Sequence, residues 1–132
     1  MTLITTRFLL VDDDLLNNYL TKITLKKSLG EVLINDFTNP ENGLEFIRSE
    51  PVYNPTDGKT TLLLDINMPI LSGWEFLEAF ELFDTSIKEQ YNIYILSSSI
   101  DLYDKNLAME NPLVLDFIEK PLNKTKIIKI FG

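Results

Sequence analysis

Three consecutive leucines, Leu62 to Leu64, followed at once by Asp65, constrain the fold of this chain more than any other stretch. A strand with one face in water alternates apolar and polar residues. This run does not alternate, which predicts a strand covered on both faces. Pro69 then predicts a loop, because proline cannot donate to a regular ladder, and an apolar pattern from Trp74 predicts a helix. Parallel sheets hold ligands at the carboxyl ends of such strands, although on this stretch alone an ordinary solvated aspartate is an equally good interpretation.

The same succession of a short apolar run and a helical pattern recurs along the whole chain. Alternating strands and helices predict an α/β fold, a parallel sheet with helices on both faces. Right-handed crossovers leave few topologies, and the five-stranded doubly wound order 2-1-3-4-5, the flavodoxin-like order, is the usual one at this length. The expected strands cover 7–11, 32–37, the leucine run ending at 64, 92–96 and 114–118, and the expected helices follow Asp14, Asn39, Gly73, Ser99 and Asn123.

Residues at the expected helix ends support this division. Asp14 and Asn123 are expected N-caps, and Asn39 followed by Pro40 has the preferred order for a cap and a first helical position. Gly30 predicts the end of the first helix.

Length and composition bound the domain organisation. A chain of 132 residues, 45% of them apolar, predicts one domain over residues 1–132, with a core over about 6–131 and no output domain. Prolines and a glycine in residues 50–59 predict the longest loop. The first six residues are too few and too polar for a signal peptide, and no apolar run approaches the roughly 20 residues of a membrane span. We therefore expect a cytoplasmic protein without membrane insertion.

Two residue types are absent from the sequence, cysteine and histidine. Their absence excludes thiol nucleophiles, disulfides, histidine-based zinc sites and imidazole acid–base catalysis. A net charge of −8 predicts no basic surface for a phosphate backbone, so nucleic acid is not an expected partner. Any chemistry must use carboxylates, hydroxyls, lysine and a bound ion.

Acidic, hydroxyl and ammonium groups follow four of the expected strands. Strands one and three are neighbours in this order, so Asp12, Asp13 and Asp65 should converge, with Ser97 and Lys120 at the ends of the next two strands. Carboxylates ~5 Å apart repel by about 3 kcal/mol per pair at an effective dielectric near 20, so they need a cation. Oxygen ligands favour Mg²⁺, with Mn²⁺ as an alternative. In such a site Asp65 could act as the nucleophile on a phosphoryl group and form an acyl phosphate.

Each candidate also has an ordinary interpretation. Asp13 or Asp14 alone is more often a helix cap, Lys120 before a proline is usually a solvated loop residue, and Ser97 alone says little. Complementary chemistry at four strand ends along one edge of a sheet favours a common site.

With these residues in this order, the chain resembles the receiver domains of two-component response regulators over nearly its whole length. The resemblance rests on LLVDDD at 9–14, LLLDINMPILSG at 62–73, YILSSS at 94–99 and FIEKP at 117–121. It implies a phosphorelay signalling domain that catalyses only its own phosphorylation and dephosphorylation, and so is not an enzyme in the ordinary sense. With no output domain expected, it implies a stand-alone receiver that acts on a downstream protein target or relays phosphate between kinases.

The resemblance also implies a role for each acidic residue. Asp65 would accept a phosphoryl group from the phosphohistidine of a sensor histidine kinase or a histidine phosphotransfer protein. Asp13, Asp65 and the backbone carbonyl of Asn67 would bind Mg²⁺ directly, and Asp12 would act mainly through water.

The remaining roles concern phosphate binding and switching. Lys120 would pair with a phosphoryl oxygen, and its bond to Pro121 is expected to be cis, which only X-Pro bonds make cheap. Ser97 matches the switch hydroxyl of the family and Phe117 the aromatic switch residue. An added charge of about −1.5 to −2 would give Ser97 and Lys120 new partners and so shift the conformation.

Three departures from the family pattern carry expectations of their own. Ser98 stands where alanine or glycine is usual and would narrow access to the phosphate. Asn67 and Ser99 match positions that tune self-dephosphorylation, and neither supplies a general base, so hydrolysis would depend on an unassisted water. The helix after Asn123 is shorter than is typical, which bears on the output surface.

Three other functions remain as alternatives. A phosphatase of the haloacid dehalogenase type also begins from a strand-end aspartate, but it needs a second acid where this chain has Asn67. A flavodoxin-like binding module would have its phosphate loop where Asp12 to Asp14 stand. A degenerate receiver that binds partners without phosphorylation is disfavoured by the intact acidic, hydroxyl and lysine positions.

Overall fold

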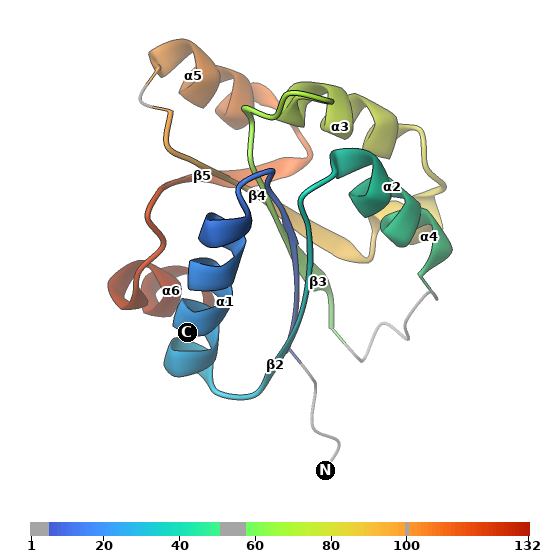
Figure 1. Cartoon of the computed structure of the whole chain (residues 1–132). Helices are drawn as coiled ribbons and strands as arrows, with labels where there is room; N and C mark the ends of the chain where they lie inside the picture. The colour runs from blue at the N-terminus through green and yellow to red at the C-terminus, as the bar shows by residue number, and fades with distance from the viewer. Residues whose placement is uncertain (1–5, 51–57, 100) are drawn as a thin grey trace.

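The computed structural model describes residues 6–50, 58–99 and 101–132. Five parallel strands form one sheet in the order β2-β1-β3-β4-β5, so the predicted doubly wound topology is confirmed (Figure 1). The apolar runs that predicted strands form them, because residues pointing to either side find a helix-covered core. The strands are β1 (Thr6–Val11), β2 (Val32–Phe37), β3 (Thr60–Leu64), β4 (Tyr91–Ser97) and β5 (Val114–Glu119).

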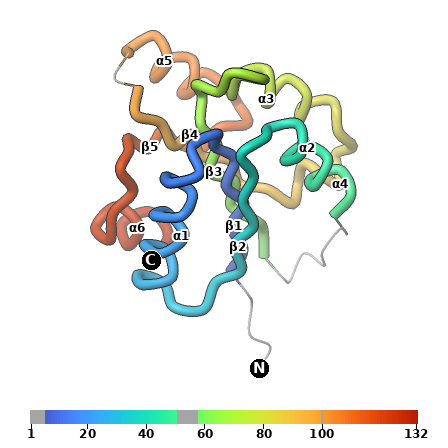
Figure 2. Tube along the Cα trace, in the orientation of Figure 1, coloured from blue at the N-terminus to red at the C-terminus, as the bar shows by residue number. Residues whose placement is uncertain are grey.

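Helices cover both faces of the sheet. The α1 helix (Leu15–Leu29) and the α6 helix (Lys124–Phe131) lie side by side on one face (Figures 1 and 2). The other face carries α2 (Pro40–Ser49), α3 (Gly73–Glu81) and α5 (Leu102–Glu110). A short helix, α4 (Thr85–Lys88), was not predicted, because four residues are too few to show an apolar period.

Alternate residues of the central strands belong to two separate cores. On β3, Leu62 and Leu64 pack with α2 and α3, whereas Leu63 packs with α1 and α6. Leu9 and Leu10 on β1 divide in the same way. Burial of a leucine side chain contributes about 1.5 to 3 kcal/mol, so the unbroken leucine run stabilises both layers at once.

The helix ends use the residues that the sequence singled out. Asp14, Asn39 and Asn123 each accept a hydrogen bond from a backbone N–H in the first turn of the following helix. Gly30 ends α1 with φ of 82°, a conformation that favours glycine. At α3, Ser72 and Glu75 form a reciprocal capping box that the sequence analysis did not identify. The predicted loop over 50–59 lies largely outside the described residues.

The α1 helix turns an unexpected side toward the sheet. Leu16 and Leu20 stand at helical spacing, a pattern that predicts a helix here, yet their side chains are 63% and 52% exposed. Asn18, Thr21 and Leu25 are buried instead. The polar side faces inward because Asn18 is hydrogen-bonded at the end of β1, as described below.

Candidate functional site

Sheet register brings the acidic strand ends together. Val11 pairs with Leu64, so the residues that follow them, Asp12 and Asp65, leave neighbouring strands at the same level. The backbone N–H of Asp65 donates to the carbonyl of Val11 at 2.9 Å. Ligand oxygens of Asp12, Asp13 and Asp65 all lie within 4.8 Å of one another. Asp12 and Asp65 are only 4% and 6% exposed, whereas Asp13 faces solvent.

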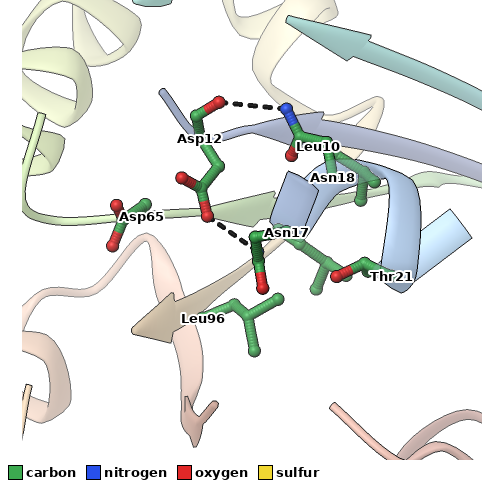
Figure 3. A pocket seen from close by; sticks show the side chains of 8 residues that line it. Leu10, Asp12, Asn17, Asn18, Thr21, Asp65 and Leu96 are labelled. Atoms are coloured by element: carbon green, nitrogen blue, oxygen red, sulfur yellow. Dashed lines mark hydrogen bonds between the residues drawn. The ribbon is translucent and has the colours of Figure 1, made fainter. Parts of the chain in front are cut away.

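Asp12 is held in place from several directions. Lys120 Nζ donates to Asp12 Oδ2 at 2.6 Å, and the backbone N–H of Asp14 donates to Oδ1 at 2.9 Å. Asn17 Nδ2 donates to Oδ2 at 2.8 Å, and Asn18 Nδ2 donates to the backbone carbonyl of Asp12 at 3.0 Å (Figure 3). Sequence reasoning missed both asparagines. The available signal was two adjacent polar residues in the first turns of a helix that starts beside the acids.

Asp65 is less well compensated than Asp12. Its Oδ1 accepts from the backbone N–H of Ile66 at 2.9 Å and lies 3.8 Å from Lys120 Nζ. Burial, followed by the charge of Asp12, raises the pKa of Asp65 from 3.8 to about 6, although Lys120 and the N–H groups of Ile66 and Asn67 act in the opposite direction. The carboxylate form of Asp65 therefore lacks sufficient positive charge around it.

Lys120 and Ser97 are joined through the backbone at the ends of β5 and β4. The N–H of Lys120 donates to the carbonyl of Ser97 at 2.9 Å, and the peptide bond from Lys120 to Pro121 is cis. The side chain of Ser97 is fully buried, and its Oγ accepts from the N–H of Ser99 at 3.1 Å. That contact leaves the proton of the Ser97 hydroxyl to be donated elsewhere.

Phe117 and Asn67, two further predicted residues, lie apart from the acidic cluster. Phe117 is half-buried and packs on the core beneath α5, with Lys105 Nζ 5.8 Å from the ring centroid. Asn67 is exposed in the loop after Asp65, and Ser98 is exposed after β4. The structure thus brings Asp12, Asp13, Asp65 and Lys120 into one cluster, and it places the other predicted residues on the adjoining loops and strands.

A small pocket opens between the acids and the start of α1 (Figure 3). Its volume is about 10 Å³, close to that of a single water-sized probe. Asp12, Asp65 and Asn17 supply the polar wall, and Leu63 is among the apolar residues that line it. The space is enough for about one water molecule.

The donor set and charge of this site fit a hard divalent cation. Three carboxylates against the single ammonium of Lys120 leave an excess of two negative charges. Oxygen ligands without sulfur or imidazole nitrogen match the preference of Mg²⁺ and Mn²⁺. The acids could therefore hold such an ion, and its charge would offset the cost of burying Asp65 as a carboxylate.

A doubly wound parallel sheet with clustered acids and a lysine at its carboxyl edge defines a receiver-like α/β domain. Residues 8–131 match the family model of the response regulator receiver domain, and the chain therefore belongs to that family. It is a receiver domain of the kind found in two-component systems. No curated protein matches the sequence.

Solved structures share the fold along nearly the whole chain. A response regulator receiver protein from Dyadobacter fermentans has a TM-score of 0.84 at 23% identity, covering 95% of this chain and 94% of that one. A two-component response regulator from Cytophaga hutchinsonii has a TM-score of 0.78 at 25% identity, covering 95% and 92%. The chemotaxis response regulator CheY4 of Vibrio cholerae has a TM-score of 0.72 at 18% identity, covering 95% and 94%.

None of the helices in the described ranges is both long enough and apolar enough to cross a lipid bilayer.

Proposed function

We propose that the chain is a phosphoacceptor switch in which Asp65 receives a phosphoryl group from a sensor histidine kinase or a histidine phosphotransfer protein. One observation carries the proposal: the buried Asp65 carboxylate lies within 4.8 Å of two other acids and 3.8 Å from Lys120 Nζ. A nucleophile, a cation site and an ammonium are the parts that phosphoryl transfer needs.

The transfer step makes one bond and breaks one. A carboxylate oxygen of Asp65 attacks the phosphorus of the donor phosphohistidine, and the phosphorus–nitrogen bond breaks with its electron pair remaining on the imidazole. An acyl phosphate forms on Asp65, and the released imidazole takes up a proton from solvent. Lys120 would pair with a phosphoryl oxygen and would loosen its 2.6 Å contact with Asp12.

Asp13, Asp65 and the backbone carbonyl of Asn67 are proposed as direct ligands of Mg²⁺, with Asp12 acting mainly through water. The exposure of Asp13 and the burial of Asp65 support an ion that enters from solvent and contacts the buried nucleophile. When bound, the ion supplies positive charge for the phosphoryl oxygens. Mn²⁺ has the same ligand preference and is the expected substitute.

Switching is proposed to run through Ser97 and Phe117. The buried Ser97 hydroxyl keeps a proton to donate, and a phosphoryl oxygen on Asp65 would be a new acceptor for it. Phe117 lies on the adjacent strand, two residues before Glu119, which pairs with Ser97, and it packs under α5. A shift at Ser97 would therefore change the surface that a downstream protein target contacts.

Kinase docking is proposed at the exposed apolar side of α1. Leu15, Leu16 and Tyr19 are 68%, 63% and 59% exposed, directly after the acidic residues of the site. A helical partner that covered these residues would bring a phosphohistidine close to Asp65.

Such a partner would be cytoplasmic, and we propose the same location for this chain. The assignment of 1–132 as a single receiver without an output domain stays a prediction.

Slow self-dephosphorylation is proposed because neither Asn67 nor Ser99, the two residues at the positions that tune this reaction, supplies a general base. Ser99 is already engaged, since its Oγ donates to Asp104 Oδ2 at 2.9 Å and accepts from the N–H of Asp101 at 3.2 Å. Asn67 is uncharged. Ser99→Glu would supply a carboxylate that could orient a water, so phosphate should be lost faster from this variant than from the wild type. Equal rates of label loss would contradict the explanation.

The test is incubation with phosphoramidate, which carries the phosphorus–nitrogen bond of the natural donor. With Mg²⁺, intact-mass spectrometry should find one added phosphoryl group, and EDTA should prevent its addition. Asp65→Asn should abolish the modification and Asp13→Asn should slow it strongly. Asp84→Asn is the matched control, because Asp84 is exposed and its side chain makes no capping hydrogen bond.

Two results would contradict the proposal. Phosphorylation that survives Asp65→Asn would place the acceptor elsewhere. A wild-type protein that stays unmodified with Mg²⁺ present would favour the degenerate receiver, which binds partners without phosphorylation.

A further inference from the structure

The α3 and α5 helices lie on the face of the sheet opposite α1 and α6 (Figures 1 and 2). Side chains of both helices line a wide groove. Its volume of about 780 Å³ lies within the range of roughly 300 to 1,000 Å³ that is usual for ligand sites. Apolar side chains, among them Trp74, Leu107 and Leu113, form much of its lining. The acids, Ser97 and Lys120 do not line it, so it is separate from the phosphoacceptor site.

The α5 wall of the groove is loosely packed. Within this helix only Ala108 is buried, while Tyr103, which lines the groove, is 67% exposed. Tyr103 and Trp74 line the same groove, and tyrosine and tryptophan are enriched at the centres of protein interfaces. The groove therefore has the surface of a binding site for an apolar anchor.

The rim of the groove is acidic. Glu78, Glu81 and Glu110 line it, and no lysine or arginine does so among the residues that the structure describes. Glu81 Oε1 lies 3.5 Å from Lys88 Nζ. Glu78 and Glu110 are exposed and form no ion pair with a lysine or arginine of the described ranges. An uncompensated pair of glutamates beside an apolar floor favours a positively charged occupant.

We propose that the α3–α5 groove docks a basic amphipathic helix of a partner protein. Its apolar side would lie on Trp74 and Leu107, and flanking lysines or arginines would pair with Glu78 and Glu110. The wall formed by α5 is nine residues long, about 13.5 Å at 1.5 Å per residue, so about two and a half helical turns of a partner would fill it. The docking goes beyond phosphoacceptance, since it uses none of the residues that surround Asp65.

Trp74 makes the proposal directly testable, because it is the single tryptophan of the chain. The probe is a fluorescein-labelled amphipathic helical peptide with a leucine stripe flanked by lysines, titrated with the whole chain. Binding should raise the anisotropy of the peptide and shift the emission of Trp74. A peptide with glutamates in place of the lysines should bind at least tenfold more weakly, and added salt should weaken the lysine peptide.

Two charge variants separate the groove from the overall acidity of the protein. Glu78→Gln combined with Glu110→Gln should weaken the lysine peptide about fivefold, the effect of losing two partly exposed charge pairs. Glu31→Gln combined with Glu41→Gln removes the same charge from exposed positions outside the groove and should leave binding unchanged. Tyr103→Ala should also weaken binding, because it removes an exposed aromatic contact.

Three results would overturn the proposal. The first is an equal loss of peptide affinity in the two double variants, because the peptide would then respond only to the net charge of the protein. The second is binding without any change in Trp74 emission, which would place the peptide elsewhere. The third is self-association in sedimentation experiments that the Glu78 and Glu110 substitutions abolish, because a second copy of the chain would then be the occupant.

Discussion

Replacing Asp65 with asparagine should stabilise the metal-free protein at neutral pH. Asparagine keeps the shape and the Oδ1 acceptor of the side chain but carries no charge, so it resembles the protonated carboxyl. The folded protein raises the pKa of Asp65 from 3.8 to about 6, which means that folding penalises the carboxylate form. The substitution removes that penalty.

The pH dependence follows from the direction of this shift. A raised pKa means that the native state holds the proton of Asp65 more tightly than the unfolded chain does. The stabilising contribution is fully present below about pH 4 and is lost as the pH rises through 6. The advantage of Asp65→Asn over the wild type should therefore grow from about 1 kcal/mol at pH 4.5 to about 3 kcal/mol at pH 7.5.

Urea unfolding at the two pH values, with EDTA present, measures this difference. With a slope of about 2 kcal/mol/M, the midpoint of Asp65→Asn should lie about 1.5 M above that of the wild type at pH 7.5. Mg²⁺ in place of EDTA should stabilise the wild type selectively and reduce the gap. A difference that does not change with pH would refute the reasoning, as would an asparagine variant less stable than the wild type at pH 7.5. Asp84→Asn is the control for removal of an exposed carboxylate.

Three further substitutions test the packing around the site. Lys120→Met should destabilise the metal-free protein by about 2 to 3 kcal/mol, because it leaves the carboxylate of Asp12 buried without its ammonium, and unchanged urea unfolding would contradict this. Gly73→Ala should cost about 3 kcal/mol or more, since its Cβ would stand 2.5 Å from the backbone carbonyl oxygen of Asp65, and an unaltered melting temperature would show that the backbone yields easily. Ser72→Ala should lower stability by about 1 kcal/mol through loss of the capping box while phosphorylation continues, and thermal unfolding of the variant would reveal whether this cap contributes.

Much of the fold could be predicted because its signals are local. Unbroken apolar runs marked the buried strands, and Asp14, Asn39 and Asn123 marked three helix starts. The parallel direction of the strands then brings their carboxyl ends to one edge of the sheet, and the right-handed crossovers restrict the strand order. Asp65 and Lys120 could be expected near each other on that basis, and they lie 3.8 Å apart.

The features that local patterns missed depend on contacts between distant segments. The spacing of Leu16 and Leu20 indicated α1 but not the side that it buries, because burial depends on what the sheet presents to the helix. The inward side carries Asn18, whose amide bonds the carbonyl of Asp12. Likewise, no local signal places Lys120 at 2.6 Å from Asp12, since 108 positions of chain separate them.

The amino-acid sequence alone determined the alternating strands and helices, the acidic, hydroxyl and ammonium groups at four strand ends, and the kind of chemistry that those groups permit. Tertiary structure decided how the charges are shared: Lys120 pairs most closely with Asp12, and Asp65 remains the acid with the raised pKa. It also formed the α3–α5 groove, to which both helices contribute apolar and acidic side chains. The two kinds of feature differ because the forces behind them act over different distances along the chain. Backbone preferences act over a few neighbouring residues, whereas burial and Coulomb interactions depend on residues that folding brings together from distant segments.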